Sequence, residues 1–150
     1  MDEFFIPGDV EGHRRPRATA RGGFVRIYDD PANLLWAERV RLAWWQAGCS
    51  QVGTGPLYVR FWAYVPRPKS HYRKDGATLS ALGQRTPIPT RKPDLDNVAK
   101  GILDALNGIA WRDDAQFARL LIDRIWSDSF NAPGLKVSYC AMAVGEGSFS

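Results

Sequence analysis

The spacing of apolar residues along the chain predicts two helices. Asp30-Pro31 supplies a capping side chain and a proline at the first turn, and apolar residues then recur at roughly helical spacing until Gly48. A second stripe of helical period follows Pro93 and ends at the stop signal Asn107-Gly108. This stripe consists of Leu95, Val98, Ala99, Ile102 and Leu106. We therefore expect helices over residues 31–47 and from about residue 95 to 106.

Runs of aromatic and β-branched residues before, between and after these helices predict strands. Four segments have this composition, namely residues 24–28, 57–65, 117–126 and 135–144. The last two are separated by Asn131, Pro133 and Gly134, which favour a turn, so we expect them to form an antiparallel pair. The expected fold class is α+β (mixed α/β), a single small domain over residues 1–150 whose mixed sheet carries two main helices.

Composition narrows the class of protein. No apolar run approaches the eighteen or so residues of a membrane span, and the acidic start lacks the features of a secretory signal, so we expect a cytoplasmic protein without membrane contact. Cys49 and Cys140 show no metal or redox spacing and are expected to be buried or half-buried thiols. With only His13 and His71 besides, a zinc site has too few ligands, and any metal must be bound by oxygen.

Charge is distributed unevenly along a chain with a net charge of +4. Residues 1–92 carry fifteen Lys/Arg against eight Asp/Glu, whereas residues 93–150 carry five against eight. Residues 13–26 hold five arginines without an acid, and the long segment 66–92 holds seven Lys/Arg, both with the proline or glycine content of loops. Such stretches are often only solubilising, but their one-sided charge favours contact with phosphates. The expected DNA-binding residues are Arg14, Arg15, Arg17, Arg21, Lys69, Arg73, Lys74, Arg91 and Lys92.

Acidic residues cluster around the second predicted helix. Asp94 and Asp96 flank a core-facing leucine at the helix entrance, where two close anions repel each other and a divalent cation would relieve the repulsion. Lys100 follows Asp96 at i+4, and Asn97 shares a face with Lys100. A second acidic pair, Asp113-Asp114, follows the helix after a turn. Trp111 comes shortly before this pair, and we expect it to be a packing anchor. Carboxylate ligands suit Mg²⁺, with Mn²⁺ as a substitute.

Each acid also has a purely structural interpretation. Asp94 can be a helix cap, Asp96 and Lys100 a solvated pair, and Asp113-Asp114 a turn. Taken one at a time, these interpretations are the more economical ones. The residues alone leave both the structural and the metal-site interpretations open.

The sequence PDLDN, then Lys100, DALNG and W-x-DD-x-Q resembles the signature of the RusA family of Holliday junction resolvases over residues 93–116. The opening RRPRATARGGFVRIYD resembles that family's basic N-terminal part more loosely. The resemblance implies that Asp94 and Asp96 are metal ligands and that Lys100 assists catalysis. It also implies that Asp114 completes the metal site, with Asp113 as a neighbouring positioning residue and Asn97 in support.

These features together predict a magnesium-dependent endonuclease that makes paired nicks in four-way DNA junctions during recombination and repair. A junction has near two-fold symmetry, so two opposed nicks call for a homodimer, which the resemblance also implies. The expected setting is the cytoplasm of a bacterium or a phage-infected host. The alternatives are a nuclease for flaps and forks, a non-catalytic DNA-binding protein, and a small-molecule phosphohydrolase.

Overall fold

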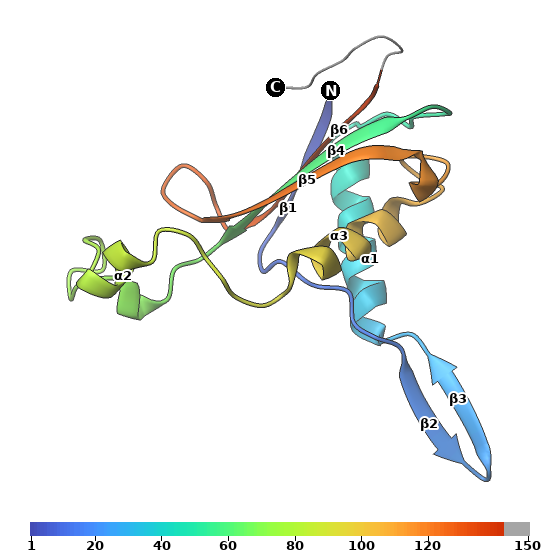
Figure 1. Cartoon of the computed structure of the whole chain (residues 1–150), viewed down its shortest axis with the longest axis horizontal. Helices are drawn as coiled ribbons and strands as arrows, with labels where there is room; N and C mark the ends of the chain where they lie inside the picture. Colours follow the sequence, from blue (N-terminus) through green and yellow to red (C-terminus); the bar gives the residue numbers. More distant parts are fainter. Residues whose placement is uncertain (143–150) are drawn as a thin grey trace.

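A mixed four-stranded sheet forms the centre of the molecule in the computed structural model, which describes residues 1–142. Its strands are β1 (Asp2–Pro7), β4 (Leu57–Val65), β5 (Phe117–Trp126) and β6 (Gly134–Ala141). They lie in the order β1-β6-β4-β5, with β4 and β5 parallel and the other two pairings antiparallel. Figure 1 shows this sheet running diagonally through the molecule.

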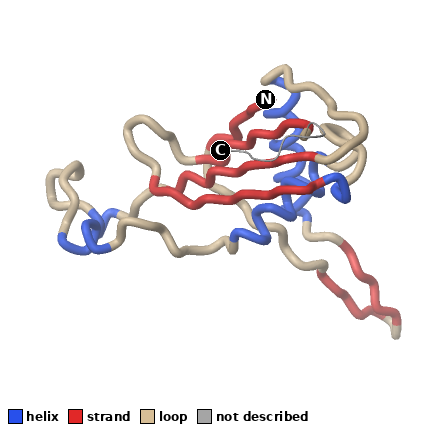
Figure 2. The backbone as a smooth tube through the Cα atoms, turned by 45° about the horizontal axis from the view of Figure 1, so that its top comes forward, coloured by secondary structure: helices blue, strands red, loops and turns tan. Residues whose placement is uncertain are grey.

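Two helices, α1 (Pro31–Gln46) and α3 (Leu95–Leu106), pack on one face of the sheet (Figures 1 and 2). The carboxylate of Asp30 caps α1 by accepting a 2.9 Å hydrogen bond from the Ala32 N–H, as the sequence predicted. The stripe on α3 is buried, with Val98 and Ile102 fully excluded from solvent. The expected fold class, a mixed sheet carrying two main helices, is confirmed. Within residues 1–142, no helix has the length and apolar character needed to cross a bilayer.

Alternation along β4 separates the two faces of the sheet. Leu57, Val59 and Phe61 point into the core beneath the helices and are fully buried. The intervening Arg60 and Trp62 lie on the opposite face, where the guanidinium group sits 4.4 Å from the indole centroid. Helices α1 and α3, with the candidate site residues on α3, therefore lie on one side of the sheet.

The expectation that the last two strands pair with each other is wrong. β4 lies between them, and β5 runs parallel to β4 rather than antiparallel to β6. The turn residues indicate that the chain reverses, but β4 is the most completely buried strand and takes the central position. β1, which the sequence did not predict, covers the other edge of β6. Residues 143 and 144, the end of the last predicted strand, lie outside the described residues.

A two-stranded hairpin projects from the body, as Figure 1 shows. It consists of β2 (Arg17–Arg21) and β3 (Phe24–Tyr28), and we call it the arm. Gly22 and Gly23 form its two-residue turn with φ of 59° and 81°, the left-handed conformation that such tight hairpins require. The predicted strand 24–28 is confirmed, whereas β2 forms where only a loop was expected.

The segment 66–92 is better ordered than the expected irregular loop. It contains the short helices η1 (Lys69–His71) and α2 (Ala81–Arg85) around the buried His71. The His71 ring meets Trp126 edge to face at 5.2 Å, and Gly83 lies so close to the His71 carbonyl that a Cβ atom would approach within 2.2 Å of it. This small packed unit, which we call the excursion, extends from the body away from the arm (Figure 1).

Candidate active site

The entrance of α3 exposes two of the predicted metal ligands. Asp94 occupies the cap position, yet its carboxylate makes no capping hydrogen bond and instead contacts the Lys92 ammonium at 3.1 Å. The Asp94 side chain is 54% exposed. Asp96 and Lys100 are exposed on the following turns, and within residues 1–142 no ion pair joins them. The carboxylates are therefore open to solvent and to a ligand, and the purely structural interpretation of Asp94 as a side-chain cap does not hold.

The N-terminal segment runs along α3 and brings basic residues beside this entrance. The His13 N–H donates to the Asn97 carbonyl at 2.9 Å, and Arg14 is held by a 2.9 Å hydrogen bond from its N–H to Asn33 Oδ1. Arg14, Lys92, Asp94 and Asn97 consequently line one hollow of about 350 Å³. Predicted phosphate-binding and metal-binding residues thus meet at one place.

A larger hollow of about 770 Å³ lies on the other side of Asp94. Arg91, Lys92 and Asp94 line its wall together with part of β5. The guanidinium group of Arg124 on β5 donates to the carbonyls of Arg91 and Pro93, which fixes the path of the chain into α3. Asp94 therefore stands on a ridge between two hollows, each with basic residues in its wall.

Asp113 and Asp114 lie beyond the other end of α3, in and before the short helix η2 (Asp114–Gln116). Asp113 caps η2 and accepts from the Ala115 N–H at 3.0 Å, the main reason that the pKa of its carboxyl is lowered. The pKa of Asp114 is raised, first by its hydrogen bond to Asp113, then by burial and by the negative charges of Asp113 and Asp104. The pair therefore holds excess negative charge that a cation would relieve.

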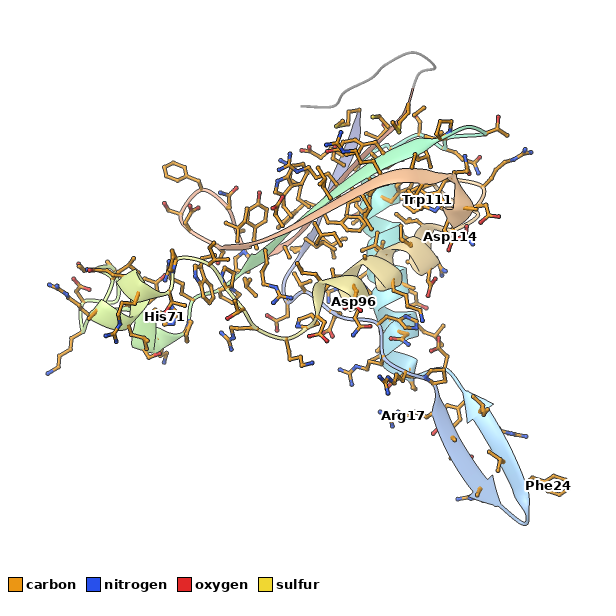
Figure 3. All side chains as sticks on the ribbon, in the orientation of Figure 1. Arg17, Phe24, His71, Asp96, Trp111 and Asp114 are labelled. Carbon is orange, nitrogen blue, oxygen red and sulfur yellow. The ribbon has the colours of Figure 1, made fainter. Side chains whose placement is uncertain are left out.

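The structure brings together some of the predicted site residues and separates others. Asp94, Asp96, Asn97 and Lys100 share the N-terminal half of α3, whereas Asp114 lies past its last turn, as Figure 3 shows. Within residues 1–142, no group of three or more His, Cys, Asp or Glu residues is arranged closely enough to hold a metal ion. A single chain in this conformation thus presents two acidic positions along one helix.

Asp104 and His13 join the site without having been predicted as functional residues. Asp104 follows Asp96 and Lys100 at four-residue intervals, and its Oδ2 lies 3.7 Å from His13 Nδ1. Its negative charge is one of the causes that raise the pKa of Asp114. The helical spacing in the sequence places Asp104 on the same face as Asn97 and Lys100, but no sequence signal places His13 opposite it.

Trp111 confirms the expected packing anchor before the acidic pair. Its side chain is fully buried and meets the rings of Phe117 at 4.8 Å and Tyr139 at 5.6 Å, both edge to face. The turn that presents Asp113 and Asp114 is consequently fixed to the core of the sheet.

The remaining predicted DNA-binding residues fall on the two projections. Arg17 and Arg21 belong to the arm, and Arg15 lies just before it, all of them exposed. Lys69, Arg73 and Lys74 are exposed on the excursion. Arg17 differs from the others because its Nε donates to Asp30 at 3.0 Å, which gives it a structural task.

Comparisons with known proteins agree with the resemblance seen in the acidic motif. Residues 7–138 match the profile of the family described as Endodeoxyribonuclease RusA. The chain is also similar to the uncharacterized protein YqaN of Bacillus subtilis (strain 168), with 32% identity over 130 residues that cover 84% of this chain and 88% of that protein. Because the family match spans both the arm and the acidic helix, this chain belongs to the RusA endodeoxyribonuclease family.

Proposed function

We propose that this member of an endodeoxyribonuclease family is a Holliday junction resolvase that makes paired nicks in four-way DNA junctions with the help of Mg²⁺. The observation that carries the proposal is the ridge at the start of α3. There the exposed Asp94 lines two hollows whose walls also contain Arg14, Arg91 and Lys92, and Asp96 is exposed two residues further along the chain. Anionic ligands beside cationic walls are what a metal-assisted reaction on a phosphodiester requires.

The carboxylate oxygens at the start of α3 are donors of the kind that a hard divalent cation binds. Asp94 already holds the ammonium group of Lys92, and neither it nor Asp96 is committed to capping the helix, so their oxygens are available to a metal. Asp114 would complete the set once it is brought to the start of α3, because within residues 1–142 of a single chain in this conformation the three acids are not close enough to hold one ion. Asp113, which accepts from the Ala115 N–H, would be the neighbouring positioning residue. Bound Mg²⁺ would supply an activated water and would screen the charge on the phosphate; Mn²⁺ would substitute for it.

Other residues of the chain would bind and orient the DNA. Lys100, one turn beyond Asp96 and exposed, would stabilise the negative charge that develops on the scissile phosphate. Asn97 is held by its backbone bond to His13 and lines the smaller hollow, where it would support the position of Asp94. Phosphate contacts from Arg14, Arg15, Arg91 and Lys92 would set the strand across α3.

A homodimer would place two such sites about a two-fold axis, matching the near symmetry of a four-way junction. The arm and the excursion extend from the body in different directions, so a dimer would offer four projections around a branched substrate (Figures 1 and 2). Recombination and repair are the processes in which such junctions arise.

Junction cleavage with a charge-neutral variant tests the proposal. Asp96→Asn should abolish nicking of a labelled four-way junction in Mg²⁺ while binding is kept or improved, because one negative charge facing the phosphates is removed. Glu3→Gln changes an exposed carboxylate on β1 that pairs with Lys136 on the face of the sheet opposite α3, so it is the matched control and should cleave normally. Full cleavage by Asp96→Asn, or cleavage by the wild type in excess chelator, would contradict the proposal. Equal cleavage of flaps, forks and linear duplex would contradict the junction preference.

A further inference from the structure

The arm has two faces of different chemistry. Cross-strand partners share a face, and alternate residues along each strand point the same way. One face therefore carries Arg17, Thr19, Arg21, Phe24, Arg26 and Tyr28. The other face carries only Ala18, Ala20, Val25 and Ile27. All ten residues of β2 and β3 are exposed, so neither face is explained by packing within one chain.

The mixed face combines positive charge with aromatic rings. Arg21 and Arg26 form no ion pair with any residue in the described range 1–142, so their charges are available to an external anion. Phe24 is 80% exposed beside the turn, and it lies directly across from Arg21 in the hairpin register. Figure 3 shows its ring standing out near the tip of the arm. An exposed phenyl ring makes no hydrogen bonds to the edges of base pairs, but it can stack on a base.

We propose that the face formed by Arg21, Phe24, Arg26 and Tyr28 binds the branch region of the DNA, with the arginines on phosphates and Phe24 stacked on an unpaired base. This inference rests on the proposed function, because it names how the same substrate is held. A two-stranded ribbon is narrow enough to enter the grooves and openings of DNA. Alternating cations and rings are the features by which proteins hold single-stranded segments without reading sequence.

The base of the arm is built to hold this face in a fixed position. Arg17 is tied to Asp30, the cap of α1, so the ribbon is attached to the same body that carries the acidic ridge. The segment before the arm is also held on α1, because the backbone N–H and carbonyl of Arg14 both form hydrogen bonds with the side-chain amide of Asn33. A contact at the tip of the arm would therefore orient the branch relative to the cleavage site.

Binding of a fluorescent four-way junction in chelator, where no cleavage occurs, tests the arm separately from the nuclease. In a salt titration, the double variant Arg21→Ala/Arg26→Ala should reduce the slope of log affinity against log salt by about 1.8, the value for two lost phosphate contacts. Phe24→Ala should weaken binding roughly 5- to 150-fold, the range for one lost stacking contact, and Phe24→Trp should restore it. The control Ile27→Thr, on the aliphatic face, should leave both quantities unchanged.

A junction with 2-aminopurine beside the branch provides a second readout. The wild type should change its fluorescence, Phe24→Ala should not, and a continuous duplex carrying the same probe should give no change. Three results would each overturn the inference. The double arginine variant could keep the wild-type salt slope, Ile27→Thr could lose as much affinity as Phe24→Ala, or the wild type could bind the junction without salt dependence. A wild type that shows the arm effects but never nicks DNA would overturn the proposed nuclease while supporting the arm.

Discussion

Arg17 donates from its Nε to Oδ2 of Asp30 at 3.0 Å, while the other oxygen of the same carboxylate accepts from the Ala32 N–H at 2.9 Å. One buried carboxylate thus begins α1 and holds the base of the arm. Its hydrogen bond to Ala32 lowers the pKa of Asp30, and the neighbouring arginines contribute to this. The position of the arm is therefore coupled to the integrity of the first helical turn.

Substitutions at Asp30 should separate these two tasks. Asp30→Ala removes both the cap and the partner of Arg17, and it should lower the melting temperature by roughly 2–4 °C, the shift expected from one lost cap in a domain of this size. Asp30→Asn keeps a good capping group but loses the charge that attracts Arg17. We expect it to melt close to the wild type, while amide exchange in β2 and β3 accelerates in both variants. Equal melting temperatures in all three proteins would contradict the capping role.

The packed unit of the excursion should depend on Arg67. Its Nη1 lies 3.0 Å from the Gly83 carbonyl oxygen, 3.3 Å from that of Thr86 and 3.2 Å from His71 Nδ1. Removing charge-assisted hydrogen bonds worth about 1.5–3 kcal/mol should open the segment at least about tenfold more often. Trypsin should then cleave after Lys69 and Lys74 correspondingly faster in Arg67→Ala.

The control for this experiment is Arg85→Ala, which also removes one cationic side chain from the excursion. Arg85 is exposed, and within residues 1–142 its side chain forms no hydrogen bond or ion pair, so cleavage at the other sites should keep its wild-type rate. If both variants are cleaved equally fast, the bonds of Arg67 do not hold the unit together.

Asp75 should titrate well below an ordinary aspartate. The hydroxyl of Thr78 donates to its Oδ2 at 2.6 Å, and this bond, followed by those from the Ala77 and Thr78 N–H groups, lowers the pKa to about 2. Because the folded pKa is lowered, the stabilising contribution of the carboxylate is fully present above the ordinary value of 3.8 and is lost as the pH falls from there through about 2.

Carboxyl NMR titration of Asp75 checks this expectation. Thr78→Val should move the measured pKa back toward 3.8, because the first of the causes of the shift is removed, whereas Thr78→Ser should keep it low. A measured wild-type pKa near 3.8 would mean that the hydrogen bonds from Ala77 and Thr78 to the Asp75 carboxylate do not form in solution.

Trp111 should contribute strongly to stability through packing alone. Trp111→Ala should lower the free energy of unfolding by about 3–5 kcal/mol, as large-to-small changes in a core do. Its indole Nε1 has no hydrogen-bond partner within residues 1–142, so Trp111→Phe loses no hydrogen bond and should cost less. Urea denaturation followed by circular dichroism measures both. If Trp111→Phe is as unstable as Trp111→Ala, the indole N–H forms a hydrogen bond in solution, and Trp111 does not stabilise the protein through packing alone.

Most of the elements that the sequence could predict have apolar positions that face the core; β3 is the exception, because all of its residues are exposed on the arm. The stripe on α3 and the proline-started α1 follow from helical periodicity, and the four predicted strands from their β-branched residues. β2 was missed because RATAR buries nothing and so shows no pattern, although Gly22-Gly23 before Phe24 is a two-residue hairpin signal. The order of the strands depends on which strand is buried on both faces. The turn residues between β5 and β6 carry no information about that.

The residues of the candidate site also differ in how far the sequence could predict their positions. Asp94, Asp96 and Lys100 are neighbours in sequence, so their spacing on one helix places them on the exposed start of α3. The distance from them to Asp114 depends on the turn around Trp111 and on the direction of β5, both of which are tertiary. The pairing of His13 with Asp104 depends on the path of the N-terminal segment over α3, which no local pattern encodes.

Lys92 should compete with a metal ion for Asp94. Its ammonium lies 3.1 and 3.2 Å from the two carboxylate oxygens, in the place where a cation bound by Asp94 would lie. An exposed pair of this kind is worth about 0–1 kcal/mol, so Lys92→Gln should bind Mn²⁺ up to about fivefold more tightly in a titration followed by electron paramagnetic resonance. Lys74→Gln, which removes the same charge from the excursion, should leave the affinity unchanged, and Asp94→Asn should weaken it. If Lys92→Gln binds Mn²⁺ no better than Lys74→Gln, Lys92 does not compete for this carboxylate, and if Asp94→Asn binds as well as the wild type, Asp94 is not a ligand.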